Sequence, residues 1–344
     1  MPYLRAPEDL GEVVGEGPSY RVDQLRRWLY STPVLNAQDM TNLPLPLRER
    51  LAESLWPFTV EVEQSADFGT TRKWLFRAGD GAAIEAVLMG YPRRVTLCIS
   101  SQAGCALGCT FCATGQFGFE RHLEAGEIVA QVAYAQAFLR QIGMPGVPDH
   151  LTNIVFMGMG EPLANYERVR EAIRRIVEVM GISARSLTVS TVGIVPGIER
   201  LAAEPWPVSL AISLHAADDE LRSSLVPINR QYPIERLIEA AQLYFEKKRR
   251  RVSIEWTLMA GVNDSEDQAV KLARIARRLR AHVNLIDLNP TPLSSLTAPD
   301  GERVQAFARS LRDAGANVTV RETRGTEIDA ACGQLRIVSG AGRG

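Results

Sequence analysis

One stretch decides how this 344-residue chain is interpreted, namely Gly104-Cys105-Ala106-Leu107-Gly108-Cys109-Thr110-Phe111-Cys112-Ala113-Thr114-Gly115. It places three cysteines in a Cys-x3-Cys-x2-Cys loop directly after a short apolar strand, and its glycines let the backbone fold around a compact group. A cubane iron–sulfur cluster normally takes four cysteine ligands, so three would leave one iron open to another ligand. The loop therefore predicts a metal centre held by Cys105, Cys109 and Cys112.

The rest of the chain from residue 94 onward alternates apolar strands with helical stretches. We expect strands at 95–99, 153–157, 187–191, 208–214, 252–258, 283–288 and 318–322, and helices at 124–142, 166–179, 196–203, 234–246, 266–280 and 300–314. Continuous apolar strands of this kind are typical of parallel strands buried on both faces. About six units are too few for an eight-fold barrel, so the pattern predicts a doubly wound sheet or an incomplete barrel.

The first ninety residues follow a different pattern. Val22, Leu25, Trp28 and Leu29 share one helical stripe, whereas residues 58–90 alternate as strands do. We therefore expect a helical accessory domain over residues 1–55, a β extension over 56–90, the α/β core over 91–338 and a tail over 339–344.

Composition limits the class of protein. The chain is 46% hydrophobic and 23% charged with a formal net charge of -1, which excludes disordered, collagen-like and coiled-coil proteins. It has no apolar run long enough for a membrane span, and its N-terminus lacks the features of a signal peptide, so we expect a cytoplasmic protein without membrane contact. The basic run Lys247–Arg251 either contacts RNA phosphates or remains a solvated helix end.

Polar residues follow several of the predicted strands. They are the turn Met157-Gly158-Met159-Gly160-Glu161-Pro162, then Ser190, the group Ser213-Leu214-His215, and Asn289. Ligands of parallel α/β folds collect at these strand ends, and the Glu161 carboxylate could receive an ammonium group. Each residue alone is also compatible with a simple turn or a hydrogen bond at a strand end.

Taken together, the motifs resemble those of one family. In chain order they are Met40–Pro44, Arg72–Phe76, Ile84-Glu85, Leu97–Gln102, the cysteine loop, Gly158–Pro162, Ser213–Ala216 and Asp329–Leu335. This combination resembles the RlmN/Cfr family of radical S-adenosylmethionine (SAM) RNA methyltransferases over residues 20–338. The resemblance implies an α/β fold, a partial (β/α)6 radical SAM barrel preceded by a small helical accessory domain and a short β extension.

The resemblance also implies cofactors and roles. It implies a [4Fe-4S] cluster and two SAM molecules per turnover, with SAM contacts at Gly160, Glu161, Ser190, Ser213, Leu214, His215 and Asn289. A methyl group would be carried on Cys332 and attacked by a 5'-deoxyadenosyl radical. Cys98 would form a disulfide bond with Cys332 to release the product, and Glu85 would accept a proton. Without the resemblance, Cys98 and Cys332 would be read as small buried apolar residues.

The implied activity is methylation of carbon 2 of an adenosine in 23S rRNA, at the peptidyl-transferase centre, and of adenosine 37 in tRNAs. An external electron donor such as flavodoxin would be required, and we expect a monomer. Two alternatives stay open at this stage. One is methylation of carbon 8 of the same rRNA adenosine, and the other is a zinc-bearing RNA-binding protein without catalysis.

Overall fold

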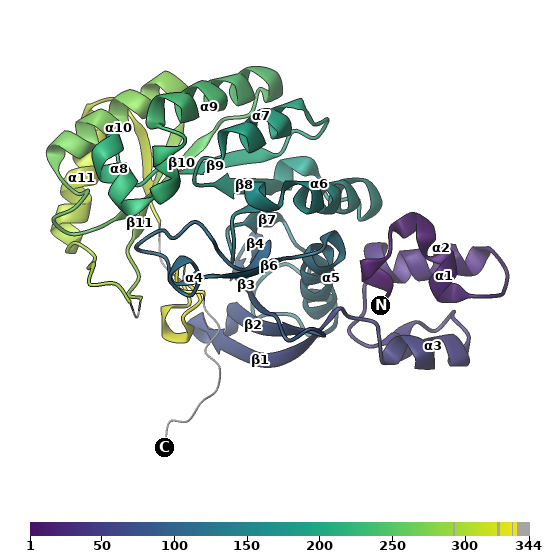
Figure 1. The fold of residues 1–344 in the computed structure, drawn as a ribbon. Helices are drawn as coiled ribbons and strands as arrows, with labels where there is room; N and C mark the ends of the chain where they lie inside the picture. Colours follow the sequence, from purple (N-terminus) through teal and green to yellow (C-terminus); the bar gives the residue numbers. More distant parts are fainter. Residues whose placement is uncertain (292, 322–323, 332, 336–344) are drawn as a thin grey trace.

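The computed structural model describes residues 1–291, 293–321, 324–331 and 333–335. Figure 1 shows a large curved sheet covered by helices on its outer side, with a small group of helices attached at one flank. No helix within the described ranges is long and apolar enough to cross a membrane. The predicted fold class, an incomplete α/β barrel with a helical accessory part, is confirmed.

One ten-stranded sheet forms the body of the molecule, in the order β1-β2-β3-β4-β7-β8-β9-β10-β11-β12. The strands β1 to β4 pair antiparallel and every later neighbour pairs parallel. Their bounds are β1 Phe58–Ala66, β2 Thr71–Ala78, β3 Ala83–Tyr91, β4 Arg94–Cys98, β7 Asn153–Phe156, β8 Leu187–Thr191, β9 Ser209–Ser213, β10 Ser253–Leu258, β11 His282–Asp287 and β12 Asn317–Val320. The predicted β extension therefore continues the barrel sheet, because β3 pairs with β4 from Tyr91↔Arg94 to Val87↔Cys98.

Helices connect the parallel strands and cover their outer side (Figure 1). They are α5 Ala125–Gln141, α6 Tyr166–Arg174 with a π-helical turn to Val179, α7 Val195–Ala203, α8 Asp219–Leu225, α9 Ile234–Lys248, α10 Glu266–Leu279 and α11 Gly301–Asp313. Six of the seven lie within a few residues of their predicted ranges. The short α8 was not predicted, because seven residues give no apolar periodicity; it is capped by Asp218, whose carboxylate accepts from the Leu221 N–H.

Two small elements inside the cysteine region were also not predicted. They are the hairpin of β5 Gln102–Gly104 and β6 Phe119–His122, and the single-turn helix α4 Ala113–Gln116. The hairpin pairs Gln102 with His122, so it closes the two ends of the cysteine loop against each other. Elements this short are set by tertiary contacts and leave little pattern in the sequence.

The N-terminal helices are α1 Gly11–Val14, α2 Tyr20–Arg26, which continues as a π-helical turn, and α3 Leu45–Ala52. The predicted stripe is partly confirmed, since Leu25 and Leu29 are fully buried and Val22 and Trp28 are half-buried. The Tyr3 ring stacks on Trp56 at 5.1 Å, and an Arg175 guanidinium donates to the Tyr3 carbonyl at 3.1 Å. These contacts fix the accessory helices to the barrel.

The outer edge of the sheet is β1, and it is irregular. Its pairing with β2 shifts register between Val60 and Val62, and most of its residues are exposed. Glu61 forms an ion pair with Arg77, and Glu63 forms one with Arg72 at 3.3 Å. The edge therefore combines a bulge with charged side chains.

Candidate active site

The cysteine loop is held in place from two sides. Gly104 has φ +72°, and a Cβ there would lie 2.1 Å from the Gly118 carbonyl oxygen, so only glycine allows the hairpin to close. The Cys105 N–H donates to the same carbonyl at 2.8 Å, and the Thr110 N–H donates to the Leu225 carbonyl at the end of α8 at 3.1 Å. The loop is thus anchored to a hairpin and a helix end.

Three thiols converge on one cavity, here called the thiol cavity. It is lined by Cys105, Cys109 and Cys112, by the turn Gly158–Pro162, and by strand-end residues that include Ser190, Ser213 and His215. Of the four cysteines that the structure describes, the fourth, Cys98, lies elsewhere. The structure therefore brings the predicted ligands and most of the predicted cofactor residues together.

The donor set fits a cluster with an open iron. Within the described ranges, no three His, Cys, Asp or Glu side chains are grouped to hold a single metal ion. A [4Fe-4S] cluster binds each thiolate through a different iron, so its ligands need not converge on one point. Burial raises the pKa of Cys105 to about 11 and raises the pKa of Cys109 well above its usual value. Both thiols stay protonated at neutral pH until a metal displaces the protons.

The ends of β4 and β7 are fastened together by the predicted motifs. The Ser100 hydroxyl donates to the Glu85 carbonyl at 2.6 Å and accepts from the Met159 N–H at 2.9 Å. The Gln102 amide oxygen accepts from the Glu161 N–H at 2.8 Å. Gly160 has φ +93°, and a Cβ there would lie 2.4 Å from the Gln102 Cβ. These contacts explain why serine and glutamine stand opposite a glycine turn.

The carboxylate of Glu161 is buried and bonded to the backbone. Its Oε1 accepts from the Leu163 N–H and its Oε2 from the Val192 N–H, both at 3.0 Å. Burial raises the pKa of Glu161 to about 7, and the two N–H donors oppose that rise. The Thr191 side chain also hydrogen bonds to this carboxylate, and Glu161 lines the thiol cavity, where the predicted ammonium contact would be made.

Serine and histidine side chains also line the thiol cavity. The Ser190 and Ser213 hydroxyls lie 3.3 Å apart and hydrogen bond. The Nδ1 of His215 accepts from the Thr257 N–H at 3.0 Å, so the neutral ring carries its proton on Nε2. Burial, and secondarily the nearby Arg222, lowers the pKa of His215 to about 3. His215 is therefore a neutral donor at the cavity wall.

Leu214 differs from the other predicted contacts. Its side chain belongs to the apolar core and does not line the thiol cavity, while its carbonyl accepts from the Arg222 Nε at 3.0 Å. Any contribution of Leu214 to cofactor binding would come from its backbone.

Arg222 is a buried residue that the sequence analysis did not single out. Its guanidinium also donates to the Val192 carbonyl at 2.5 Å and to the Ser213 carbonyl at 3.3 Å, and its Nη1 donates to Asn229 Oδ1 at 2.7 Å. It therefore joins the ends of β8 and β9 beside the cysteine loop. The short, polar sequence of α8 does not indicate that Arg222 joins these strand ends.

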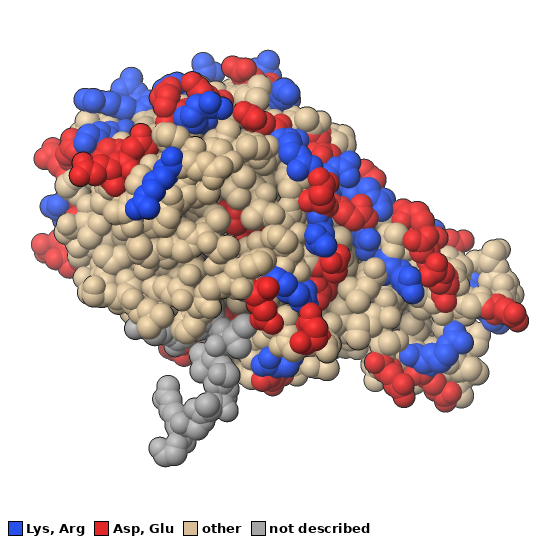
Figure 2. Space-filling model, in the orientation of Figure 1, with Lys and Arg blue, Asp and Glu red and all other residues tan. Residues whose placement is uncertain are grey.

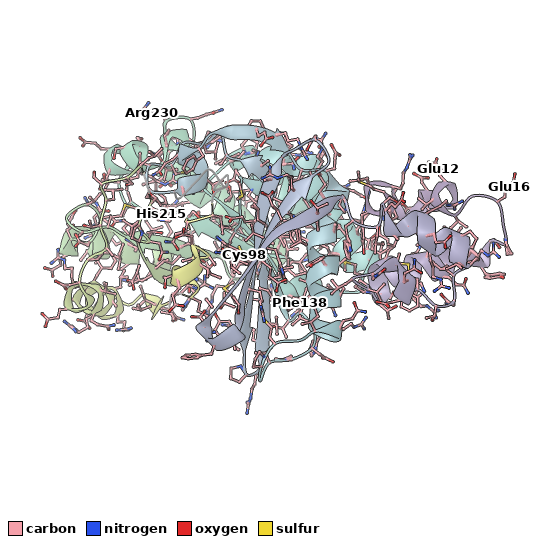
Figure 3. All side chains as sticks on the ribbon, turned by 90° about the horizontal axis from the view of Figure 1, so that it is seen from below. Glu12, Glu16, Cys98, Phe138, His215 and Arg230 are labelled. Carbon is pink, nitrogen blue, oxygen red and sulfur yellow. The ribbon has the colours of Figure 1, made fainter. Side chains whose placement is uncertain are left out.

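A second cavity of 540 Å³ lies inside the barrel and is here called the barrel cavity. Pockets that bury small ligands have volumes of about 300–1,000 Å³. Cys98 and Asn289 line it, and Figure 3 places Cys98 at the centre of the molecule, where the strands meet. Further polar lining comes from strand residues, which include Thr96, Asn153, Thr188, Asn284 and Thr319, and from the arginines Arg94, Arg321 and Arg324. A chamber lined with so many polar groups suits a ligand better than a packed core.

The two cavities meet. Met157, Ile286, Arg321 and Leu335 line both of them. A ligand in the barrel cavity would therefore be next to a ligand in the thiol cavity.

The segment around Cys332 runs between the two cavities. Cys332 itself lies outside the described residues, but Ala330 and Ala331 line the barrel cavity and Gly333 lines the thiol cavity. The Ala113 N–H, directly after Cys112, donates to the Gly333 carbonyl at 2.8 Å. Upstream, the Gly325 N–H donates to Asp67 Oδ2 at 3.1 Å. The segment is thus anchored to the cysteine loop and to the β extension.

Glu85 lies beside this segment and not on a cavity wall. Its carboxylate forms an ion pair with Lys73 at 3.1 Å, and both side chains are more than nine-tenths buried. The Lys73 ammonium also donates to the Asp329 carbonyl at 3.4 Å. Lys73 belongs to the motif Arg72–Phe76, and nothing in that motif alone indicates this contact.

The basic run Lys247–Arg251 is used partly within the protein. Lys248 donates to the Glu204 carbonyl, and Arg250 donates to Ser209 Oγ at 2.8 Å. Figure 2 shows most charged side chains along the margins of the visible face, around a broad area with few charges that has acidic atoms near its middle. Whether the run also contacts RNA stays a prediction.

Comparison with known proteins places the chain among radical SAM enzymes. Residues 99–273 match the model of the radical SAM superfamily, and residues 9–56 match that of the ribosomal RNA large subunit methyltransferase N-terminal domain. A relative from Chloroflexus aurantiacus, "Probable dual-specificity RNA methyltransferase RlmN", is 53% identical over 92% of this chain and 87% of its own length. A protein of the same name from Thermobifida fusca is 51% identical over 95% of this chain and 91% of its own.

A solved structure agrees with these matches. The crystal structure of a radical SAM methyltransferase from Sphaerobacter thermophilus superimposes with a TM-score of 0.90 at 49% identity, covering 97% of this chain and 98% of the other. The likeness spans the accessory helices, the β extension and the barrel.

Proposed function

Because the chain belongs to the RlmN family of radical SAM RNA methyltransferases, we propose that it methylates carbon 2 of an adenosine in 23S rRNA and of adenosine 37 in tRNAs. One observation carries this proposal. The segment on either side of Cys332 borders both cavities, so a group carried on that cysteine could pass from a cofactor site to a substrate site.

The cofactors follow from the family. The family implies a [4Fe-4S] cluster and SAM, and Cys105, Cys109 and Cys112 are the residues that would hold the cluster. When bound, the cluster supplies the electron that cleaves SAM to methionine and a 5'-deoxyadenosyl radical. The chain's own groups line the SAM site, among them the Glu161 carboxylate and the neutral His215.

The Cys332 sulfur acts as the methyl carrier. Carbon 2 of adenine is not nucleophilic, so direct polar transfer from SAM would fail. The Cys332 thiolate would take a methyl group from one SAM, and that S-methyl group would lose a hydrogen atom to the 5'-deoxyadenosyl radical supplied by a second SAM. The resulting S-methylene radical adds to carbon 2 in the barrel cavity and links the RNA covalently to Cys332.

Cys98 and Glu85 complete the turnover. Glu85 accepts the proton that leaves carbon 2. The Cys98 sulfur attacks the Cys332 sulfur, which forms a disulfide and breaks the bond from the Cys332 sulfur to the RNA-linked methylene carbon. That carbon takes up a proton and becomes the 2-methyl group. The second SAM is the net two-electron oxidant that balances the disulfide, since the electron used to cleave it is recovered in this step. An external reductant, flavodoxin in this proposal, must then return two electrons to the cysteines.

The test is an anaerobic assay of cluster-loaded protein with SAM, reductant and unmodified RNA. We expect 5'-deoxyadenosine together with 2-methyladenosine, identified by mass spectrometry against standards of 2- and 8-methyladenosine. Cys332→Ala should yield no methyladenosine. Product that matches the 8-methyl standard would support the carbon-8 alternative, and normal methylation by Cys332→Ala would refute the carrier role.

Metal analysis separates catalysis from the zinc alternative. Protein purified without oxygen should be brown, with close to four irons per chain. Stoichiometric zinc in a colourless protein that does not cleave SAM would favour a non-catalytic RNA-binding role.

A further inference from the structure

Two arginines share one aromatic ring at the rim of the barrel cavity. The guanidinium carbons of Arg94 and Arg324 each lie 4.2 Å from the centre of the Tyr91 ring. All three residues line the cavity; Arg94 is exposed, and Tyr91 and Arg324 are half-buried. Cation–π contact therefore holds two positive charges close together where the cavity opens to solvent.

Neutral oxygen atoms help to position Arg324. Arg324 donates from Nη1 to Thr70 Oγ1 and to the Gly90 carbonyl, both at 3.2 Å. Within the part of the chain that the structure describes, neither Arg94 nor Arg324 forms an ion pair with an acid, whereas Arg72, Arg77 and Arg121 do. Two guanidiniums held by one neutral ring raise the local positive potential, and an anion bound beside them would offset their repulsion.

The position of the pair indicates which anion. It stands at the rim, while Cys98 and the residues before Cys332 line the same cavity further in. An enzyme that modifies a base brings the nucleotide out of its stack and into a pocket, which leaves the flanking phosphates at the mouth of that pocket. Guanidinium forks match the geometry of phosphate oxygens.

We propose that Arg94 and Arg324, held on Tyr91, bind a backbone phosphate next to the adenosine that is inserted into the barrel cavity. We call these three residues the rim clamp. The proposal rests on the proposed function, because it takes RNA as the ligand. It assigns the rim clamp to positioning of the substrate, with no part in the chemistry.

The test measures RNA binding in the absence of SAM and reductant. The probes are a synthetic tRNA anticodon stem–loop with adenosine at position 37, a stem–loop that reproduces the target region of 23S rRNA, and copies of both in which one phosphate beside the target adenosine is replaced by an uncharged methylphosphonate. The proteins are the wild type, Arg94→Gln and Arg93→Gln, all loaded with cluster. Arg93 is the matched control, because it is an exposed arginine next to Arg94 that does not line the cavity.

We expect Arg94→Gln to bind unmodified RNA about tenfold more weakly than the wild type. The slope of log K against log salt concentration should decrease in magnitude by about 0.7, which is the value for one lost phosphate contact to a single strand. The methylphosphonate at the contacted position should weaken the wild type by the same factor and leave Arg94→Gln unaffected. Arg93→Gln should bind like the wild type.

Three results would overturn the rim clamp. Equal losses in Arg93→Gln and Arg94→Gln would show a general electrostatic effect. If the affinity losses from Arg94→Gln and from the methylphosphonate multiply when both are present, the two changes act at different places. Unchanged binding of the methylphosphonate RNA by the wild type would mean that the arginines hold some other anion, such as free phosphate.

These outcomes are separate from failure of the proposed function. Methylation at carbon 8 would refute the assigned carbon and leave the binding result intact. A wild-type protein that binds neither stem–loop more tightly than an unrelated RNA hairpin would refute the RNA substrates and the rim clamp together.

Discussion

Replacing Lys73 by methionine tests the ion pair behind the Cys332 segment. The ammonium lies 3.1 Å from the Glu85 carboxylate with both side chains buried, and their attraction is about 5 kcal/mol at an effective dielectric constant of about 20. Because Lys73→Met leaves the buried Glu85 carboxylate without that ammonium, we expect the free energy of unfolding to fall by about 3 kcal/mol. Much of the loss should be restored in Lys73→Met/Glu85→Gln, which removes both charges.

Arg72→Met is the matched control for this experiment. Arg72 is the neighbouring residue and pairs with Glu63 at 3.3 Å, but both of those side chains are about one-third exposed. We expect this exposed pair to contribute less than about 1 kcal/mol. Urea unfolding under anaerobic conditions, followed by circular dichroism, of the wild type, Lys73→Met, Glu85→Gln and Lys73→Met/Glu85→Gln would give the four values of the double-mutant cycle, with Arg72→Met measured beside them.

The reasoning fails if Lys73→Met costs no more than Arg72→Met. It also fails if the double variant is no more stable than Lys73→Met, because the cost would then come from lost packing and not from the charge. Since Lys73 also donates to the Asp329 carbonyl, Lys73→Met should in addition slow methylation in protein that is still folded.

Three further predictions concern the cavities. Cys98→Ala should accumulate RNA bound covalently to the protein, because no second sulfur can release the RNA from Cys332. The adduct should appear as a shifted band on a denaturing gel, and an unshifted band with normal product would contradict the role of Cys98 in releasing the RNA. Gly160→Ala should lower SAM affinity in equilibrium dialysis at least about tenfold, since its φ is +93° and a Cβ would lie 2.4 Å from Gln102; Gly79→Ala, with nothing within 4 Å of a Cβ, is the control. The pKa of His215 is lowered to about 3, so this residue binds a proton more readily in the unfolded chain than in the folded one. The free energy of unfolding should therefore fall as the pH drops from about 6.5 toward 3, by up to about 1.4 kcal/mol per pH unit. Urea unfolding at each pH should show a shallower fall for His215→Gln, and equal slopes would contradict the assignment.

Much of the barrel could be predicted from apolar periodicity. Helices α9, α10 and α11 bury one stripe each, and α5 is apolar and buried on most of its sides. The strands β7 to β11 carry buried apolar residues at alternate positions, so both periods are visible in the sequence. The rule that ligands collect at strand ends then brought Glu161, Ser190 and His215 to one cavity with the three cysteines.

The remaining features depend on residues that are far apart in the sequence. Tyr91 and Arg324 meet only because the segment after β12 returns to β3, and Lys73 reaches Asp329 across 256 positions. The Arg222 guanidinium donates to backbone carbonyls at the ends of β8 and β9, of which only β8 is far from α8 in the sequence. No local pattern encodes such contacts, so a single sequence predicts the strand-end residues better than the groups that support them.

The irregular outer edge of the sheet has a consequence for self-association. A nine-residue edge strand such as β1 presents unpaired backbone groups that could pair with the same strand of another molecule. The shifted register between Val60 and Val62 and the charges of Glu61 and Glu63 interrupt that template. A chain with Glu61→Val and Glu63→Val would carry an unbroken apolar row along this edge and should aggregate more readily during expression.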